Sequence, residues 1–129
     1  MKQENFDFRT IRSFEDACKK EKIDPTVLPD VTGILPEFSD AIVNAYKLMV
    51  IYKAINNGCC LDWNNSKQRK YFPYFGVLSS GYGFSDSSYY YYYTHTTVGS
   101  RLCTDTSEKA CYIAEQFGEE YKEFFLYKE

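Results

Sequence analysis

The chain has 129 residues, of which 44% are hydrophobic and 26% are charged, and its formal net charge is −3. This length matches one domain, and this apolar content is enough to form a core, which excludes a wholly disordered chain. The acidic balance also argues against a general polyanion binder, because nucleic-acid affinity comes largely from cations. We therefore expect a single domain over residues 1–129, with residues 1–12 extended or flexible.

Several features predict a cytoplasmic protein. The first seven residues mix charges and lack the apolar run that a secretory signal requires. The most apolar window, residues 41–55, is interrupted by Asn44, Lys47 and Lys53 and is too short to cross a bilayer. The five cysteines form an odd-numbered set, and without an export signal we expect them to be reduced thiols.

The first half of the chain predicts two helices. Ser13 and the acids that follow it are typical of a helix start, and we expect a short helix over residues 14–22. Residues 23–36 hold three of the four prolines and predict an irregular connection that wraps the core. Three-and-four spacing of apolar residues then predicts a helix over residues 37–56, which we expect to be the most buried element. It should stop at Asn57-Gly58.

The second half predicts a small sheet and a closing helix. We expect a first strand over residues 71–78, turn chemistry at 81–88, a second strand over 89–98, and a short third strand over 100–104. Thr106 or Ser107 can cap one last helix, whose apolar residues keep helical spacing as far as Phe125. The predicted fold class is α+β: two main helices and a short N-terminal helix packed on a small antiparallel hairpin or three-stranded sheet.

The run of five tyrosines, residues 89–93, is the most unusual local pattern. In a strand, Tyr89, Tyr91, Tyr93 and His95 would share one face while Tyr90 and Tyr92 would share the other. One face can pack against a helix, which leaves tyrosines on the opposite face. Exposed tyrosine favours contact with a protein, so Tyr89, Tyr91, Tyr93 and His95 are the candidate partner-binding residues. Alternatively, the rings cover only their own domain.

A second candidate surface combines cations with aromatic rings. Lys67, Arg69 and Lys70 precede Tyr71 and Tyr74, and single-stranded nucleic acids are held by this combination of phosphate contacts and stacking. The segment matches no known nucleic-acid-binding signature, and a cation cluster is more often a solvated turn. Single-stranded nucleic-acid binding by these five residues is therefore the alternative function.

Catalytic and metal-binding patterns are weak. His95 is the only histidine, and no CxxC or HxxxH spacing prepares a metal site, so we predict no metal and no cofactor. Gly81-Tyr82-Gly83 begins like a dinucleotide fingerprint, but Asp86 stands where the third glycine is needed. An enzyme that pairs His95 with a cysteine or carboxylate ranks last among the functions considered.

Five short motifs resemble a family of small uncharacterised proteins that gut Bacteroidales and their phages or mobile elements encode. They are Ser13–Cys18, Ile23–Pro25, Ala45–Leu48, Leu61–Asn65 and Gly99–Cys103. The resemblance extends over residues 11–126 and implies a bacterial or phage origin, but it transfers no site residue. Our leading prediction is a non-enzymatic protein-interaction module that acts through the tyrosine-rich hairpin, as a homo-oligomer or as an accessory protein of a phage or mobile element.

Overall fold

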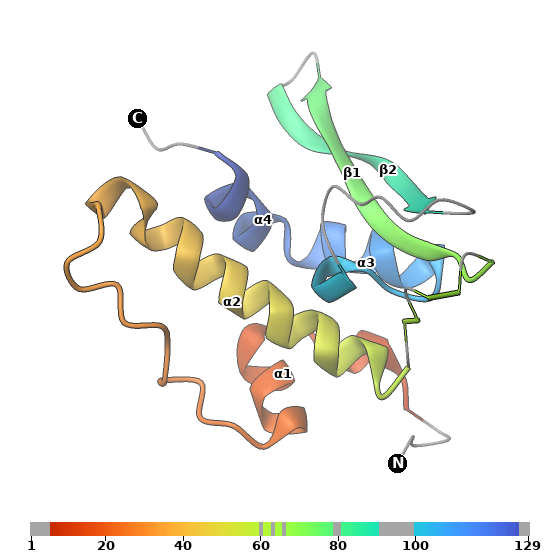
Figure 1. Ribbon diagram of the computed structural model, residues 1–129, viewed down its shortest axis with the longest axis horizontal. Coiled ribbons are helices and arrows are strands. Elements are labelled where there is room, and N and C mark those ends of the chain that lie inside the picture. The colour runs from red at the N-terminus through yellow and green to blue at the C-terminus, as the bar shows by residue number, and fades with distance from the viewer. Residues whose placement is uncertain are drawn as a thin grey trace.

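The computed structural model describes residues 6–59, 61, 62, 64, 65, 67–78, 81–90 and 100–126. The helices in these ranges are α1 (Phe14–Glu21), α2 (Pro36–Asn56), α3 (Ser107–Gln116) and α4 (Gly118–Phe125). The strands are β1 (Lys70–Leu78) and β2 (Gly81–Tyr90), and two short 3-10 helices are η1 (Phe8–Thr10) and η2 (Ser100–Leu102). Figure 1 shows their arrangement. The predicted fold class is confirmed in its coarser form, a mixed fold in which helices dominate.

Helix α1 begins at the predicted cap. The Ser13 hydroxyl accepts a hydrogen bond from the Asp16 N–H at 3.1 Å, and the Asp16 carboxylate accepts one from the Arg12 N–H at 3.0 Å. These bonds satisfy donors that the start of a helix leaves unpaired. The helix ends at Lys22, whose φ of 61° lies in the left-handed region.

The segment before α1 is folded from residue 6 onward. Ile11 is buried in the core, and η1 precedes it. The Tyr112 hydroxyl donates to the Ile11 carbonyl at 2.7 Å, and the Gln116 amide donates to the Arg12 carbonyl at 2.9 Å. The prediction of an extended or flexible stretch over 1–12 is therefore not met at residues 8–12, because α3 binds this backbone. Residues 1–5 lie outside the described residues.

Helix α2 runs through the middle of the molecule, with α1 packed on one side and α4 on another (Figure 1). Leu48, Ile51, Ala54 and Ile55, all in its second half, are fully buried. The helix stops as predicted, because Asn57 and Gly58 both have positive φ, 47° and 82°. In the described part of the chain, no helix is long and apolar enough to cross a membrane.

The connection between α1 and α2 is irregular, as predicted, but several of its apolar side chains are exposed to solvent. It swings wide of the helices before it returns to the start of α2 (Figure 1). Val27 and Leu35 are 64% and 58% exposed. The prediction that this connection wraps the core is therefore not met at these two side chains.

Strand β1 pairs antiparallel with β2, from Lys70 opposite Tyr90 to Leu78 opposite Gly81, with a register shift after Tyr74. Residues 81–88, predicted as a turn, instead form most of β2. Pairing with β1 decides here, since strand preference depends strongly on context. Of the predicted second strand over 89–98, residues 91–98 lie outside the described residues.

The predicted third strand over 100–104 is wrong at its start. Residues 100–102 form η2, and Thr104 alone makes a bridge to Tyr71 on β1, with N–H to O=C bonds of 2.8 and 2.9 Å. A chain that turns in a 3-10 helix cannot present an extended edge to a neighbouring strand.

The predicted single closing helix is divided into α3 and α4. The division lies at Phe117, whose φ and ψ of −117° and 31° leave the helical region. Phe117 is 1% exposed, and Gly118, a weak helix former, follows it. The change of direction buries Phe117 and brings Tyr121 of α4 against α2. Thr106 caps α3 as expected, by accepting from the Lys109 N–H at 3.1 Å.

Candidate functional site

One face of α2 is only partly covered by the rest of the described chain. Phe38, Ile42 and Met49 follow the three-and-four spacing of one helix face, and they are 37%, 36% and 40% exposed. The prediction that α2 is the most buried element therefore holds only for its second half. An exposed row of large apolar residues is a common mark of an interaction site.

This face forms the floor of an apolar groove of about 560 Å³. Ala41 and Ala45 lie on the floor, and their small side chains leave space above the helix. Pro29 of the α1–α2 connection and Phe124 of α4 contribute to the walls. We call this hollow the α2 groove; its lining residues are Pro29, Phe38, Ala41, Ile42, Ala45, Tyr46, Met49 and Phe124.

An acid borders one end of the α2 groove. A smaller hollow of about 140 Å³ shares Phe38, Ala41 and Phe124 with it, and adds Glu37 together with the end of α4. Phe125 and Leu126, which also line this hollow, are exposed. The apolar surface therefore continues to the first turn of α2, where it meets a carboxylate.

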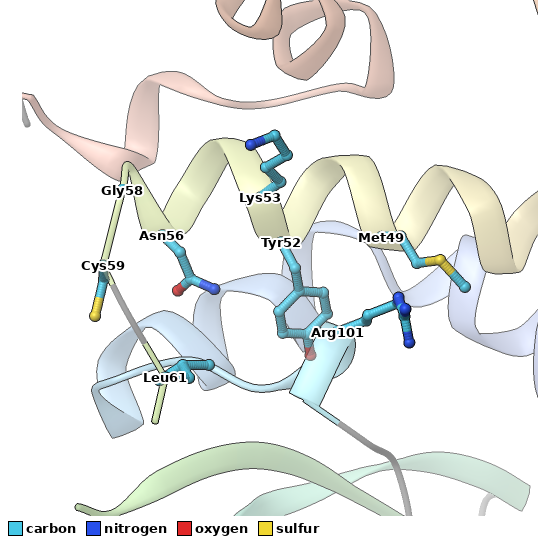
Figure 2. A pocket seen from close by; sticks show the side chains of 8 residues that line it. All are labelled: Met49, Tyr52, Lys53, Asn56, Gly58, Cys59, Leu61 and Arg101. Atoms are coloured by element: carbon cyan, nitrogen blue, oxygen red, sulfur yellow. The ribbon is translucent and has the colours of Figure 1, made fainter. Parts of the chain in front are cut away.

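A polar pocket of about 450 Å³ adjoins the other end, and Met49 lines both (Figure 2). The pocket lies between the last turns of α2 and η2, and its lining residues are Met49, Tyr52, Lys53, Asn56, Gly58, Cys59, Leu61 and Arg101. Figure 2 shows the Lys53 side chain pointing away from Asn56 and Tyr52. Its ammonium lies 3.5 Å from the Glu21 carboxylate. Arg101, which is exposed, is thus the cation of the pocket.

The wall behind the polar pocket is held by buried polar groups. The Asn56 amide donates to the Cys103 carbonyl at 3.0 Å, while its Oδ1 is buried and accepts no bond from the described residues. The hydroxyls of Tyr52 and Tyr121 bond to each other and join α2 to α4. Burial, together with Tyr121, raises the pKa of Tyr52 well above its usual value. These contacts fix the pocket wall rather than supply a reactive group.

The two buried thiols, Cys18 and Cys103, offer little reactivity. Burial raises the pKa of the Cys103 thiol to about 12, although Lys70 acts in the opposite direction, and burial also raises the pKa of Cys18. A thiol with a raised pKa is a poor nucleophile, since the thiolate is the reactive form. No group of three His, Cys, Asp or Glu residues in the described ranges could hold a metal ion.

The candidate partner-binding residues fall at the edge of what the structure describes. Tyr91, Tyr93 and His95 lie outside the described residues. Of Tyr89 only the backbone is described, in β2 opposite Tyr71. The tyrosine-rich surface and any chemistry of His95 therefore stay predictions.

The basic and aromatic candidates are not a single surface. Lys67 and Arg69 are exposed, but Lys70 is 3% exposed, and its ammonium donates to the carbonyls of Asn65 and Gln68 at 3.0 Å each. The prediction that Lys70 contacts phosphate is corrected, because this cation holds the preceding turn together.

Of the two tyrosines in that set, Tyr71 already makes contacts within the fold. Tyr71 is half-buried and its backbone bridges Thr104, whereas the side chain of Tyr74 lies outside the described residues. The expected stacking platform therefore has one ring that the structure places, and that ring is not fully open to solvent.

Sequence reasoning placed Phe38, Ile42 and Met49 in the helical stripe of the core and so missed the groove. A signal was present: the apolar positions of α2 extend well past a single stripe, because Val43, Val50 and Ile51 add a further face. A helix that is apolar over most of its circumference needs cover on every side. Which side lacks cover is decided by the packing of α1 and α4.

No protein family, curated protein or solved structure matches this chain. The resemblance to proteins of gut Bacteroidales and their phages therefore stays a prediction.

Proposed function

We propose that the protein is a non-enzymatic protein-interaction module whose α2 groove binds an amphipathic helix of a partner protein. The observation that carries this proposal is the exposed row of Phe38, Ile42 and Met49 in an apolar groove of about 560 Å³. A groove of this kind receives the apolar face of a helix through residues spaced three and four apart.

The shape of the groove favours a protruding helix over a flat surface. Ala41 and Ala45 leave room above the floor, while Pro29 and Phe124 stand at its walls. From Phe38 to Met49, the α2 residues at the two ends of the groove, the helix rises about 1.5 Å per residue, or roughly 16 Å in all, which suits a partner helix of about three turns.

The tyrosine-rich hairpin remains a second surface proposed for protein contact, together with the accessory role in a phage or mobile element. Its side chains are not among those described, so nothing observed favours it over the groove. The nucleic-acid alternative is weakened, because Lys70, one of its three cations, is buried and bonded to backbone carbonyls.

A selection experiment tests the proposal. A phage-displayed library of helical peptides of about 16 residues, with leucine at three-and-four spacing and all other positions randomised, is selected against the whole protein. We expect recovered peptides to bind the wild type and to lose at least about tenfold in affinity with Ile42→Asp, since a buried unpaired charge is costly. Fluorescence anisotropy with labelled peptides measures the affinities.

Val27→Asp is the matched control, because Val27 is also apolar and exposed but does not line the groove. It should leave the affinity unchanged, and circular dichroism should show both variants folded. Failure to recover any peptide that distinguishes the wild type from Ile42→Asp would overturn the proposal. So would a wild type that dimerises in light scattering through this face, since a second copy would then be the occupant.

A further inference from the structure

The α2 groove carries opposite charges at its two ends. Glu37 borders the apolar hollow in the first turn of α2, and Arg101 lines the polar pocket beside Met49 and Asn56. Both side chains are exposed, and neither makes an ion pair with another residue that the structure describes. A ligand lying along the whole groove therefore meets a carboxylate at one end and a guanidinium at the other.

Two cations of α2 face α1. The Lys53 ammonium lies 3.5 Å from the Glu21 carboxylate, and the Lys47 ammonium lies 5.4 Å from the centre of the Phe14 ring. Both contacts direct these cations towards α1. Glu37 lines the hollow at one end of the groove and Arg101 lines the pocket at the other, so an occupant that extends over both ends encounters these two charges.

We propose that the groove sets the direction of its occupant: the partner helix lies antiparallel to α2, with an acidic first turn at Arg101 and a basic last turn at Glu37. This inference rests on the proposed function. Helices are stabilised by acids in the first turn and by cations in the last turn. An antiparallel helix of this ordinary kind brings each of its charged ends against the opposite charge of the groove.

The reverse direction is disfavoured on the same grounds. A parallel helix would place its last-turn cations beside Arg101 and its first-turn acids beside Glu37. Its dipole would also run alongside that of α2 in the same sense. Exposed ion pairs are individually weak, so the two ends together should change the affinity by about fivefold rather than by orders of magnitude.

The test uses the strongest peptide from the selection, with its end turns rebuilt in two versions. One version has glutamates in the first turn and lysines in the last, and the other exchanges them. The wild-type protein should bind the first version about fivefold more tightly. The double variant Glu37→Lys with Arg101→Glu should reverse this ratio, because both charges of the groove are exchanged. Comparing ratios removes any difference in helicity between the peptides.

A nitroxide on the first residue of the peptide reports the direction. It should broaden the backbone amide signals of residues 56–59 in a nuclear magnetic resonance spectrum, and not those of residues 37–40. Broadening at 37–40, or an affinity ratio that is the same for the wild type and the double variant, overturns the inference. In either case the peptide still distinguishes the wild type from Ile42→Asp, so the proposed function survives. If the peptide bound Ile42→Asp as tightly as the wild type, the groove would not be the binding site, and the proposed function would fail.

Lys122→Glu with Glu119→Lys is the matched control for the double variant. Both residues are charged members of α4 outside the residues that line the groove, and the pair of substitutions also leaves the net charge unchanged. It should leave the affinity ratio of the wild type intact. A reversal with the control as well would show that the preference follows the general field of the molecule, and would overturn the role of Glu37 and Arg101.

Discussion

The two halves of α2 are made of similar residues but have different surroundings. Ile51 and Ile55 in the second half are fully buried between α1, α4 and η2, whereas Ile42 and Phe38 in the first half are more than one-third exposed. The same helix thus contributes core residues at one end and a partly exposed apolar surface at the other. Apolar residues do not reveal which role they have until the packing of their neighbours is known.

The contrast implies different physical requirements on the two halves. In the buried half, shape and volume matter, because the interior is closely packed and a missing methylene leaves a cavity. In the exposed half, what matters is the surface that remains for a partner. The predictions below separate these roles, from the largest expected effect to the smallest.

The same substitution at two isoleucines gives the clearest separation. Ile51→Ala should lower the free energy of unfolding by about 2–5 kcal/mol, because it leaves a cavity in a fully buried site. Ile42→Ala should lower it by less than about 1 kcal/mol, because the side chain is already partly in water. Chemical denaturation followed by circular dichroism measures both. Equal losses at the two positions would show that the groove is part of the core.

The hydroxyl pair of Tyr52 and Tyr121 tests how firmly α4 is fixed to the buried half. Tyr52→Phe should cost about 1–3 kcal/mol, because it removes a buried hydrogen bond between α2 and α4. The double variant with Tyr121→Phe should cost less than the sum of the two single losses. A double-mutant cycle by urea denaturation gives the coupling, and strict additivity would contradict the bond.

Alkaline pH should weaken the buried half without a direct effect on the groove. The pKa of Cys103 is raised to about 12, so between pH 9 and 12 the folded chain keeps a proton that the unfolded chain releases. This contribution is fully present below pH 9, and it is lost as the pH rises towards 12, at most by about 1.4 kcal/mol per pH unit. The raised pKa of Tyr52 acts in the same direction above pH 10.

Urea denaturation at a series of pH values measures this slope. Cys103→Ala removes one of the groups whose raised pKa produces this slope, so its stability should fall less steeply between pH 9 and 10 than that of the wild type. An unchanged slope would mean that the Cys103 thiol is not protected in the folded protein.

Much of the helical structure could be predicted from local residues. Ser13 and Thr106 cap α1 and α3, and Asn57-Gly58 ends α2, because each of these signals acts through bonds or dihedral angles within a few residues. The strand β1 also lies close to its predicted range. Two predictions that depend on contacts between elements failed. The hairpin turn was expected at 81–88, and the closing helix was expected to continue unbroken through Phe117.

For the candidate site, the sequence showed which residue types are present but not where they lie in the fold. It showed that α2 is rich in apolar residues and that Lys67, Arg69 and Lys70 are clustered. It did not show that Lys70 turns inward to two carbonyls, or that Arg101 of η2 reaches the pocket beside Met49. Such contacts join residues that are far apart in the chain or depend on a particular turn, and no local pattern encodes them.

The sequence by itself determined where α1 and α3 begin, where α2 ends and which residues are apolar, since capping and periodicity act over one or two turns. Only the tertiary structure decided that Ile51 and Ile55 of α2 are buried while Phe38 and Ile42 stay partly exposed in a groove. The physical reason is that burial belongs to the contact between elements. A side chain is part of the core or of a binding surface according to what packs against it.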